Sequence, residues 1–159
     1  MKVAIAGAGI AGTYLARLLR EKGISPDLFD GFGHRTSCRY RSCGWGAPVG
    51  IGSYLARVGL DLDDYLMGRM SSMSFDGLVA TTPLCTIDKP GLLRDLASGF
   101  TVHAEPLAGR TADSYGIIVD ATGIARAFLP PCRNELLLPA VQQRQIQRDW
   151  AREFWGRAH

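Results

Sequence analysis

Blocks of apolar and polar residues alternate at the start of the chain and predict a strand, a helix and a second strand. Residues 2–6 form a short apolar run with β-branched side chains, which is typical of a buried strand. Residues 13–22 carry apolar side chains at helical spacing, and Gly23 marks the end of this helix. Its apolar face consists of Tyr14, Leu15, Leu18 and Leu19, and we expect Arg17, Arg20 and Glu21 to point away. Residues 26–30 predict a second short strand.

The middle of the chain has a weaker pattern. Residues 31–53 are rich in Gly, Ser, Arg and Cys and fit neither a helical nor a strand period. A loop of this length in a compact domain is more often functional than idle, so we expect it to contact a ligand. Residues 53–68 predict two short helices broken at Gly59. Residues 73–82 predict an antiparallel hairpin that turns at Asp76-Gly77.

Residues 88–121 again show clear sequence signals for a helix and for strands. Asp88 is placed to cap a helix that has Pro90 in its first turn and ends near Gly99. Residues 100–104 and 116–121 predict two more strands. Strands that alternate with helices along the sequence indicate an α/β fold with a mostly parallel sheet.

The chain divides into two segments. Residues 1–130 carry the strand and helix pattern and are expected to form one domain. Residues 131–159 form a C-terminal extension, in which residues 139–156 predict an amphipathic helix. We expect its Trp150 and Phe154 to pack on the domain, on a partner chain or on a second copy.

Composition is that of a soluble globular protein, with 47% hydrophobic and 21% charged residues. The net charge of +3 is small and scattered, which argues against a nucleic-acid partner. Neither a signal peptide nor a membrane span is recognisable, so we expect a cytoplasmic protein. The four cysteines form no CxxC pair and the three histidines are dispersed, which predicts free thiols and no metal.

A glycine motif follows the first strand and opens the first helix. Gly7, Gly9 and Gly12 have the GxGxxG spacing of dinucleotide-binding βαβ units, the Rossmann fingerprint. Gly7 would allow the tight turn, Gly9 the approach of a pyrophosphate to the backbone, and Gly12 the close packing of helix on strand. Backbone N–H groups at the helix start, including those of Ile10 and Ala11, would bind the phosphates. We therefore predict a Rossmann-like α/β fold with helices on both faces of the parallel sheet and a small antiparallel β segment.

The acidic residue that closes the second strand completes this fingerprint. Asp30 is placed to accept hydrogen bonds from ribose hydroxyls, with Gly31 beside it, and its charge would oppose the additional phosphate of NADP. The fingerprint itself does not separate FAD from NAD. The alternative is that the three glycines serve only a tight turn and bind no ligand.

Two later segments resemble a known family. Residues 41–46, Arg-Ser-Cys-Gly-Trp-Gly, and residues 119–126, Val-Asp-Ala-Thr-Gly-Ile-Ala-Arg, resemble segments of FAD-dependent oxidoreductases of the geranylgeranyl reductase type. That family lies within a broader class that includes aromatic hydroxylases and lycopene cyclases. The resemblance covers about residues 1–130, with the pieces in the same order as in the family.

The resemblance implies a flavoprotein that binds FAD. It implies that the glycines and Asp30 face the ADP moiety, that Cys43 and Gly44 lie near the flavin end, and that the turn from Asp120 to Gly123 passes close to the pyrophosphate. It also implies reduction of an isoprenoid-like or other apolar substrate by the flavin. We expect this chain to need a partner chain for that activity.

Several residues of the predicted loop have both a functional and a structural interpretation. Cys43 is a weak catalytic candidate because Arg39 and Arg41 could lower its thiol pKa, and the alternative is that it is a small loop residue. Arg35, Arg39 and Arg41 could pair with phosphate oxygens or form a solvated basic loop. Trp45 could stack on an aromatic ring or serve as a local hydrophobic anchor. No histidine receives an acid or base role.

Two other functions are compatible with the sequence. The first is an NAD-binding Rossmann module without flavin chemistry. The second is a non-catalytic subunit that retains the Rossmann core and associates through its C-terminal helix.

Overall fold

The computed structural model describes residues 1–31, 45–75, 77–123 and 126–130, which form two β-sheets and the helices packed against them. The larger sheet is parallel, with the strand order β6-β2-β1-β7. Its strands are β1 (Val3–Ala6), β2 (Asp27–Phe29), β6 (Val102–His103) and β7 (Ile117–Asp120). The smaller sheet is antiparallel, with the order β3-β5-β4, and consists of β3 (Gly46–Pro48), β4 (Leu66–Phe75) and β5 (Leu78–Ile87).

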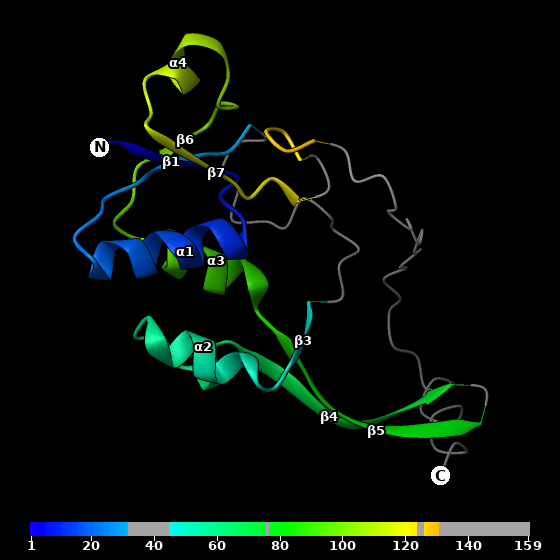
Figure 1. The fold of residues 1–159 in the computed structure, drawn as a ribbon. Coiled ribbons are helices and arrows are strands. Elements are labelled where there is room, and N and C mark those ends of the chain that lie inside the picture. The colour runs from blue at the N-terminus through cyan, green and yellow to red at the C-terminus, as the bar shows by residue number, and fades with distance from the viewer. Residues whose placement is uncertain (32–44, 76, 124–125, 131–159) are drawn as a thin grey trace.

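Helices lie on both faces of the parallel sheet. In Figure 1, α1 (Ile10–Glu21) and α3 (Lys89–Ala97) lie on one face, and the short α4 (Gly109–Asp113) lies on the other. A further helix, α2 (Ile51–Arg57), and the 3-10 turn Leu62–Asp64 pack with the smaller sheet. The prediction of a Rossmann-like α/β fold with an antiparallel segment is confirmed.

Helix α1 lies between two hydrophobic cores. One face of α1, with Ala16, Leu15 and Leu19, packs on Ile5 and Leu28 of the parallel sheet. Another face, which carries Ile10, Tyr14 and Leu18, packs on a second core, whose buried members include Leu55, Cys85, Ile87, Leu92 and Leu96. Because α1 contributes to both cores, it fixes the position of one sheet relative to the other.

The side chain of Arg17 on α1 has a different environment from the one that the sequence predicts. The pattern predicts that this side chain points away from the core, but its guanidinium reaches across to the ends of two other helices. It donates to the Leu96 carbonyl at 3.1 Å, to the Val58 carbonyl at 3.1 Å, and also to the Asp95 carbonyl. The last carbonyls of a helix have no intrahelical partner, so a cation is stabilised at this position. Arg17 therefore joins α1 to the C-terminal ends of α2 and α3.

The hairpin is longer than predicted. Strands β4 and β5 each span ten residues and form an arm that extends away from the body of the molecule in Figure 1. Residues 66–68, which the pattern assigns to a helix, belong to β4. Leu78 and Val79 near the turn are 76% and 68% exposed, so the outer part of this β4–β5 arm has little cover from the described residues.

Two other predictions change in detail. Part of the predicted loop 31–53 has regular secondary structure, because β3 pairs with β5 and α2 begins at Ile51. A three-residue strand of Gly, Ala and Pro has no recognisable period, which explains the error. Two short helical segments do follow, separated at Gly59, which has a φ of 71°. The predicted helix over 139–156 lies outside the described residues.

The predicted cap of α3 is confirmed. The Asp88 carboxylate accepts a hydrogen bond from the Gly91 N–H at 3.1 Å, and Pro90 lies in the first turn. The cap satisfies a donor that would otherwise lack a partner at the helix start. Local signals of this kind determine where α3 begins.

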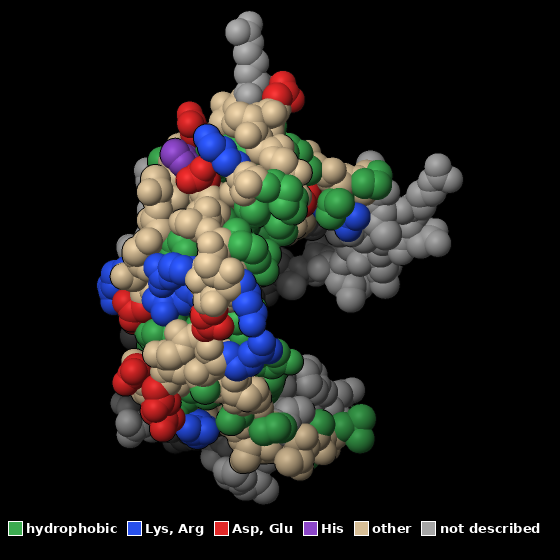
Figure 2. Space-filling model, turned by 60° about the vertical axis from the view of Figure 1, so that its left-hand side comes forward, with side chains coloured by type: hydrophobic (Ala, Val, Ile, Leu, Met, Phe, Trp, Pro, Cys, Tyr) green, Lys and Arg blue, Asp and Glu red, His purple; other side chains and the backbone are tan. Residues whose placement is uncertain are grey.

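Charged side chains of both signs lie on the surface of the described residues (Figure 2). On the face drawn in Figure 2, Lys and Arg side chains are interspersed with Asp and Glu. None of the helices in the described ranges has both the length and the apolar character that a membrane crossing requires.

Candidate functional site

Three glycines form a corner between β1 and α1, here called the glycine corner (Gly7, Gly9 and Gly12). Gly7 has a φ of 105°, a conformation that residues with a Cβ rarely adopt. A Cβ at Gly7 would lie 2.3 Å from the carbonyl oxygen of Ala121, which follows β7. Glycine is therefore required at this position both for the turn and for the approach of the β7 chain.

Gly12 allows α1 to lie directly on the turn. A Cβ at Gly12 would lie 2.0 Å from the Gly7 carbonyl oxygen and 3.2 Å from Cγ2 of Ile5. A distance of 2.0 Å is far inside van der Waals contact, so any side chain here would push α1 away from β1. The packing roles predicted for Gly7 and Gly12 agree with this geometry.

Gly9 differs from the other two glycines because space beside it is open. A Cβ at Gly9 would meet nothing within 4 Å, and the residue is exposed. Gly9 is the N-cap of α1, no side chain caps this end, and the first helical bond is from the Thr13 N–H to the Gly9 carbonyl at 3.0 Å. The N–H groups of Ile10, Ala11 and Gly12 precede that bond and have no acceptor within the helix. Such a helix start binds anions.

Asp30 directly follows β2 at the same edge of the sheet. Its backbone N–H donates to the His103 carbonyl at 2.9 Å, which ties the end of β2 to β6. Gly31 lies close to the loop between β6 and α4, because a Cβ at Gly31 would be 3.0 Å from Cβ of Pro106. Asp30 is half-buried at this edge.

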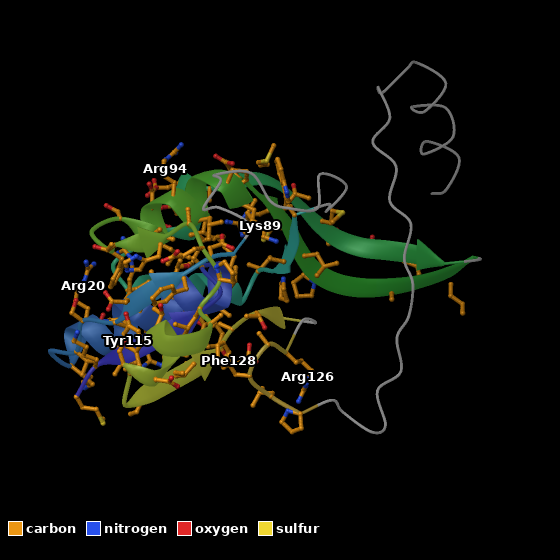
Figure 3. The ribbon with its side chains drawn as sticks, turned by 90° about the horizontal axis from the view of Figure 1, so that it is seen from above. Arg20, Lys89, Arg94, Tyr115, Arg126 and Phe128 are labelled. Atoms are coloured by element: carbon orange, nitrogen blue, oxygen red, sulfur yellow. The ribbon has the colours of Figure 1, made fainter. Side chains whose placement is uncertain are left out.

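Asp120 ends β7 and holds the turn that follows it. Its Oδ1 accepts from the Thr122 backbone N–H at 3.0 Å and the Thr122 hydroxyl at 2.6 Å, and its Oδ2 accepts from the Phe128 N–H at 2.8 Å. Burial acts to raise the pKa of Asp120, but these hydrogen bonds from Thr122 and Phe128 outweigh it and hold the pKa below its ordinary value. Figure 3 shows Phe128 and Arg126 in the turn after β7. The carboxylate serves to order this turn against Gly7.

The structure brings most of the predicted site residues to one edge. Strands β1, β2 and β7 are parallel, so the glycine corner, Asp30 and the Asp120–Gly123 turn all follow carboxyl ends of strands at the same edge. Ligands of open α/β sheets bind at this edge. The predicted residues Arg41, Cys43 and Gly44, together with Arg35, Cys38 and Arg39, lie outside the described residues.

A pocket of about 190 Å³ lies next to the glycine corner. Its apolar lining comes from Ile10, Trp45, Ala47, Ile51, Ile87 and Leu92. Gly46 and Lys89 complete the lining, and Figure 3 shows Lys89 at the start of α3, close to the base of the β4–β5 arm. Whole ligand sites usually measure about 300–1,000 Å³, so this pocket would hold only part of a ligand. Sequence reasoning missed the pocket because its lining comes from five separate elements.

Trp45 is the unusual residue of the pocket. It has a φ of 51° although it is not a glycine, and its indole Nε1 is buried without a hydrogen-bond partner. Both features are uncommon, and backbone strain of this kind is often found at ligand sites.

A Tyr–Asp–His group braces β2 and its neighbour β6 on the α4 face, and it was also missed from sequence. Tyr115 donates to Asp27 Oδ2 at 2.7 Å, and the His103 ring stacks on Phe29 with centroids 4.5 Å apart. Burial, followed by the Asp27 carboxylate, raises the pKa of Tyr115 to about 12. This group supports the strands that carry Asp30 and does not lie in the pocket.

No protein-family model and no curated protein match this chain. A geranylgeranyl bacteriochlorophyll reductase-like protein from Thermoplasma acidophilum is 16% identical over 64% of this chain and 29% of its own, with a TM-score of 0.46. The 2,6-dihydroxypyridine-3-hydroxylase of Arthrobacter nicotinovorans is 20% identical over 64% of this chain and 28% of its own, with a TM-score of 0.48. This chain therefore spans less than a third of the length of either protein.

Proposed function

We propose that the chain binds FAD and forms the nucleotide-binding part of an oxidoreductase. The observation that carries this proposal is the difference among the three glycines. Gly7 and Gly12 are blocked by backbone atoms at 2.3 and 2.0 Å, while Gly9 faces open space at the start of a twelve-residue helix. A structural turn accounts for the first two glycines but gives no reason for glycine at the third.

The residues at the sheet edge fit a dinucleotide. The N–H groups of Ile10, Ala11 and Gly12 would bind the pyrophosphate, because the helix start supplies donors and a positive dipole end. Asp30 would accept hydrogen bonds from the ribose and disfavour NADP. The turn from Asp120 to Gly123 would border the phosphates from the β7 side, since Ala121 lies against Gly7.

The pocket supports FAD over NAD as the ligand. It lies directly beyond Ile10, the first residue of α1, so a ligand with its phosphates at the helix start could place its far end there. The apolar lining suits an aromatic ring, and the motif order of residues 1–130 resembles that of FAD-dependent reductases. A bound flavin supplies the transfer of electrons, while the protein supplies orientation and exclusion of water.

The finer parts of the proposal rest on the family resemblance. They are an apolar, isoprenoid-like substrate and a partner chain that completes the substrate site. A weak catalytic role for Cys43 and cofactor contacts from Arg41 and Gly44 belong to the same group. NAD binding without flavin chemistry is the second candidate, favoured by the glycine corner and Asp30, which would serve either cofactor.

The test is the visible spectrum of the purified protein and of the Gly9→Val variant. The wild-type protein should be yellow and release FAD on heating. Gly9→Val should be folded and colourless, because its side chain would occupy the open space in front of the helix start. Gly50→Val is the matched control, since Gly50 is also an N-cap glycine with nothing within 4 Å and does not line the pocket.

Retention of the full complement of FAD by Gly9→Val would contradict the proposed position of the pyrophosphate. Release of NAD in place of FAD would favour the second candidate. A protein that binds neither nucleotide in a titration would favour the non-catalytic association subunit.

A further inference from the structure

We infer that Trp45 is a ligand-contacting residue that turns on binding and donates its indole N–H to a carbonyl oxygen of the flavin ring. The inference rests on the proposed binding of FAD and adds a specific donor to it. Nothing in the sequence pattern distinguishes this role from that of a hydrophobic anchor.

The first observation is the unsatisfied donor. The Nε1 of Trp45 is one of two buried side-chain polar atoms without a partner within the described ranges, the other being the hydroxyl of Tyr14. Buried donors in native proteins are nearly always paired, so an unpaired one calls for an explanation. A ligand acceptor that becomes available on binding is such an explanation.

The second observation is the composition of the pocket. Trp45 lines it together with aliphatic side chains such as Ile10, Ile51 and Leu92. None of these side chains can accept a hydrogen bond. The carbonyl oxygens of a flavin ring are acceptors that lie at the edge of an otherwise flat aromatic system, so a ring bound in this apolar pocket would supply an acceptor to an indole N–H that turns toward it.

The third observation is the backbone of Trp45. Its φ of 51° lies in the left-handed region, where a bulky residue is strained. The backbone carbonyl of Trp45 accepts from the Ile87 N–H at 3.1 Å, which holds the residue at the start of β3. The side chain is therefore held at the pocket wall by a backbone bond that does not depend on the indole.

The indole must turn for this contact to form. The ring lines the pocket, but its Nε1 is covered by protein atoms and cannot reach a ligand in the present arrangement. Rotation about the side-chain bonds moves the N–H without breaking the bond between Trp45 and Ile87. Binding would then pair a donor that is unpaired in the free protein, so ring binding and side-chain rotation would be coupled.

The test is an NMR titration of the protein freed of nucleotide, with FAD as the probe. Indole N–H groups give separate signals, and the chain has three tryptophans, so the signal lost in Trp45→Phe identifies Trp45. On saturation with FAD this signal should move downfield as the hydrogen bond forms. Trp45→Phe should weaken FAD binding about tenfold, because it keeps a ring but removes a donor.

Tyr14→Phe is the matched control, because it removes the other unpaired buried donor, which does not line the pocket. It should leave FAD affinity within about twofold of wild type. If FAD binds and the Trp45 signal stays in place, or if Trp45→Phe binds FAD as tightly as wild type, the inference is wrong. If FAD does not bind at all, the proposed function itself is wrong, which the absence of yellow colour would reveal separately.

Discussion

The two sheets position the candidate site by opposite means. At the parallel sheet, the site depends on missing side chains, because backbone atoms of Gly7, Gly12 and Ala121 approach one another where a Cβ would not fit. At the antiparallel sheet, the site depends on side chains, since apolar residues from β3, β5 and the neighbouring helices form the pocket. Added atoms should therefore harm the first region, and removed atoms should harm the second.

Addition of a methyl group at Gly12 should have the largest effect. In Gly12→Ala the new Cβ would overlap the Gly7 carbonyl oxygen at 2.0 Å, so α1 would have to shift from β1. We expect a loss of about 3 kcal/mol or more in the free energy of unfolding, measured by urea denaturation. Retention of wild-type stability by Gly12→Ala would show that the corner adapts and would remove the basis of the comparison.

Removal of the Arg17 guanidinium should have the next largest effect. Arg17→Met keeps the aliphatic stem but leaves the Leu96 and Val58 carbonyls without this donor. We expect a loss of about 2 kcal/mol in the free energy of unfolding, since hydrogen bonds from charged groups contribute about 1.5–3 kcal/mol. Arg20→Met is a suitable control, because Arg20 is exposed and, among the described residues, it makes a long hydrogen bond to the Gly99 carbonyl at 3.4 Å and lies over the Phe100 ring. Equal losses in the two variants would contradict the joining role of Arg17.

A matched pair of tyrosines gives the smallest and most direct comparison of the two regions. Tyr65 in the second core donates to Asp95 Oδ2 at 2.8 Å, and Tyr115 beside the parallel sheet donates to Asp27 Oδ2 at 2.7 Å. Each phenylalanine variant should lose about 1 kcal/mol of stability at pH 8. The two losses should be similar although one tyrosine serves each region.

The same tyrosines predict a limit to alkaline stability. Burial and then the hydrogen-bonded carboxylate raise the pKa of each phenol from 10.0 to about 12. Because the folded state holds these protons more tightly, their contribution is complete below pH 10 and is lost as the pH rises from 10 to about 12. Thermal unfolding across this range should show a smaller decline in the double phenylalanine variant than in wild type. An identical decline in both would assign the loss to other groups.

Local signals explain which parts of the fold could be predicted. The β1–α1–β2 unit and the capped start of α3 follow from residues that are neighbours in sequence. The solvent-facing role expected for Arg17 was wrong because its acceptors, at residues 58, 95 and 96, are brought to it only by tertiary packing. The short β3 was missed since pairing with β5, and not its own pattern, makes it a strand.

The candidate site shows the same division. The glycine corner and Asp30 could be located from spacing, because the residues belong to a single βαβ unit. The contact between Gly7 and Ala121 and the five-element lining of the pocket could not, since each depends on residues distant in sequence. The unpaired indole of Trp45 has no sequence signature at all.

The pairing of β1 with β7 has a consequence for the order of assembly. Val3 lies beside Ile117, so β1 gains this neighbour only after more than a hundred further residues have left the ribosome. Until then the Gly7 turn lacks the Ala121 backbone that closes it. A nascent chain halted before residue 117 would contain the whole glycine motif and still be unable to complete the corner.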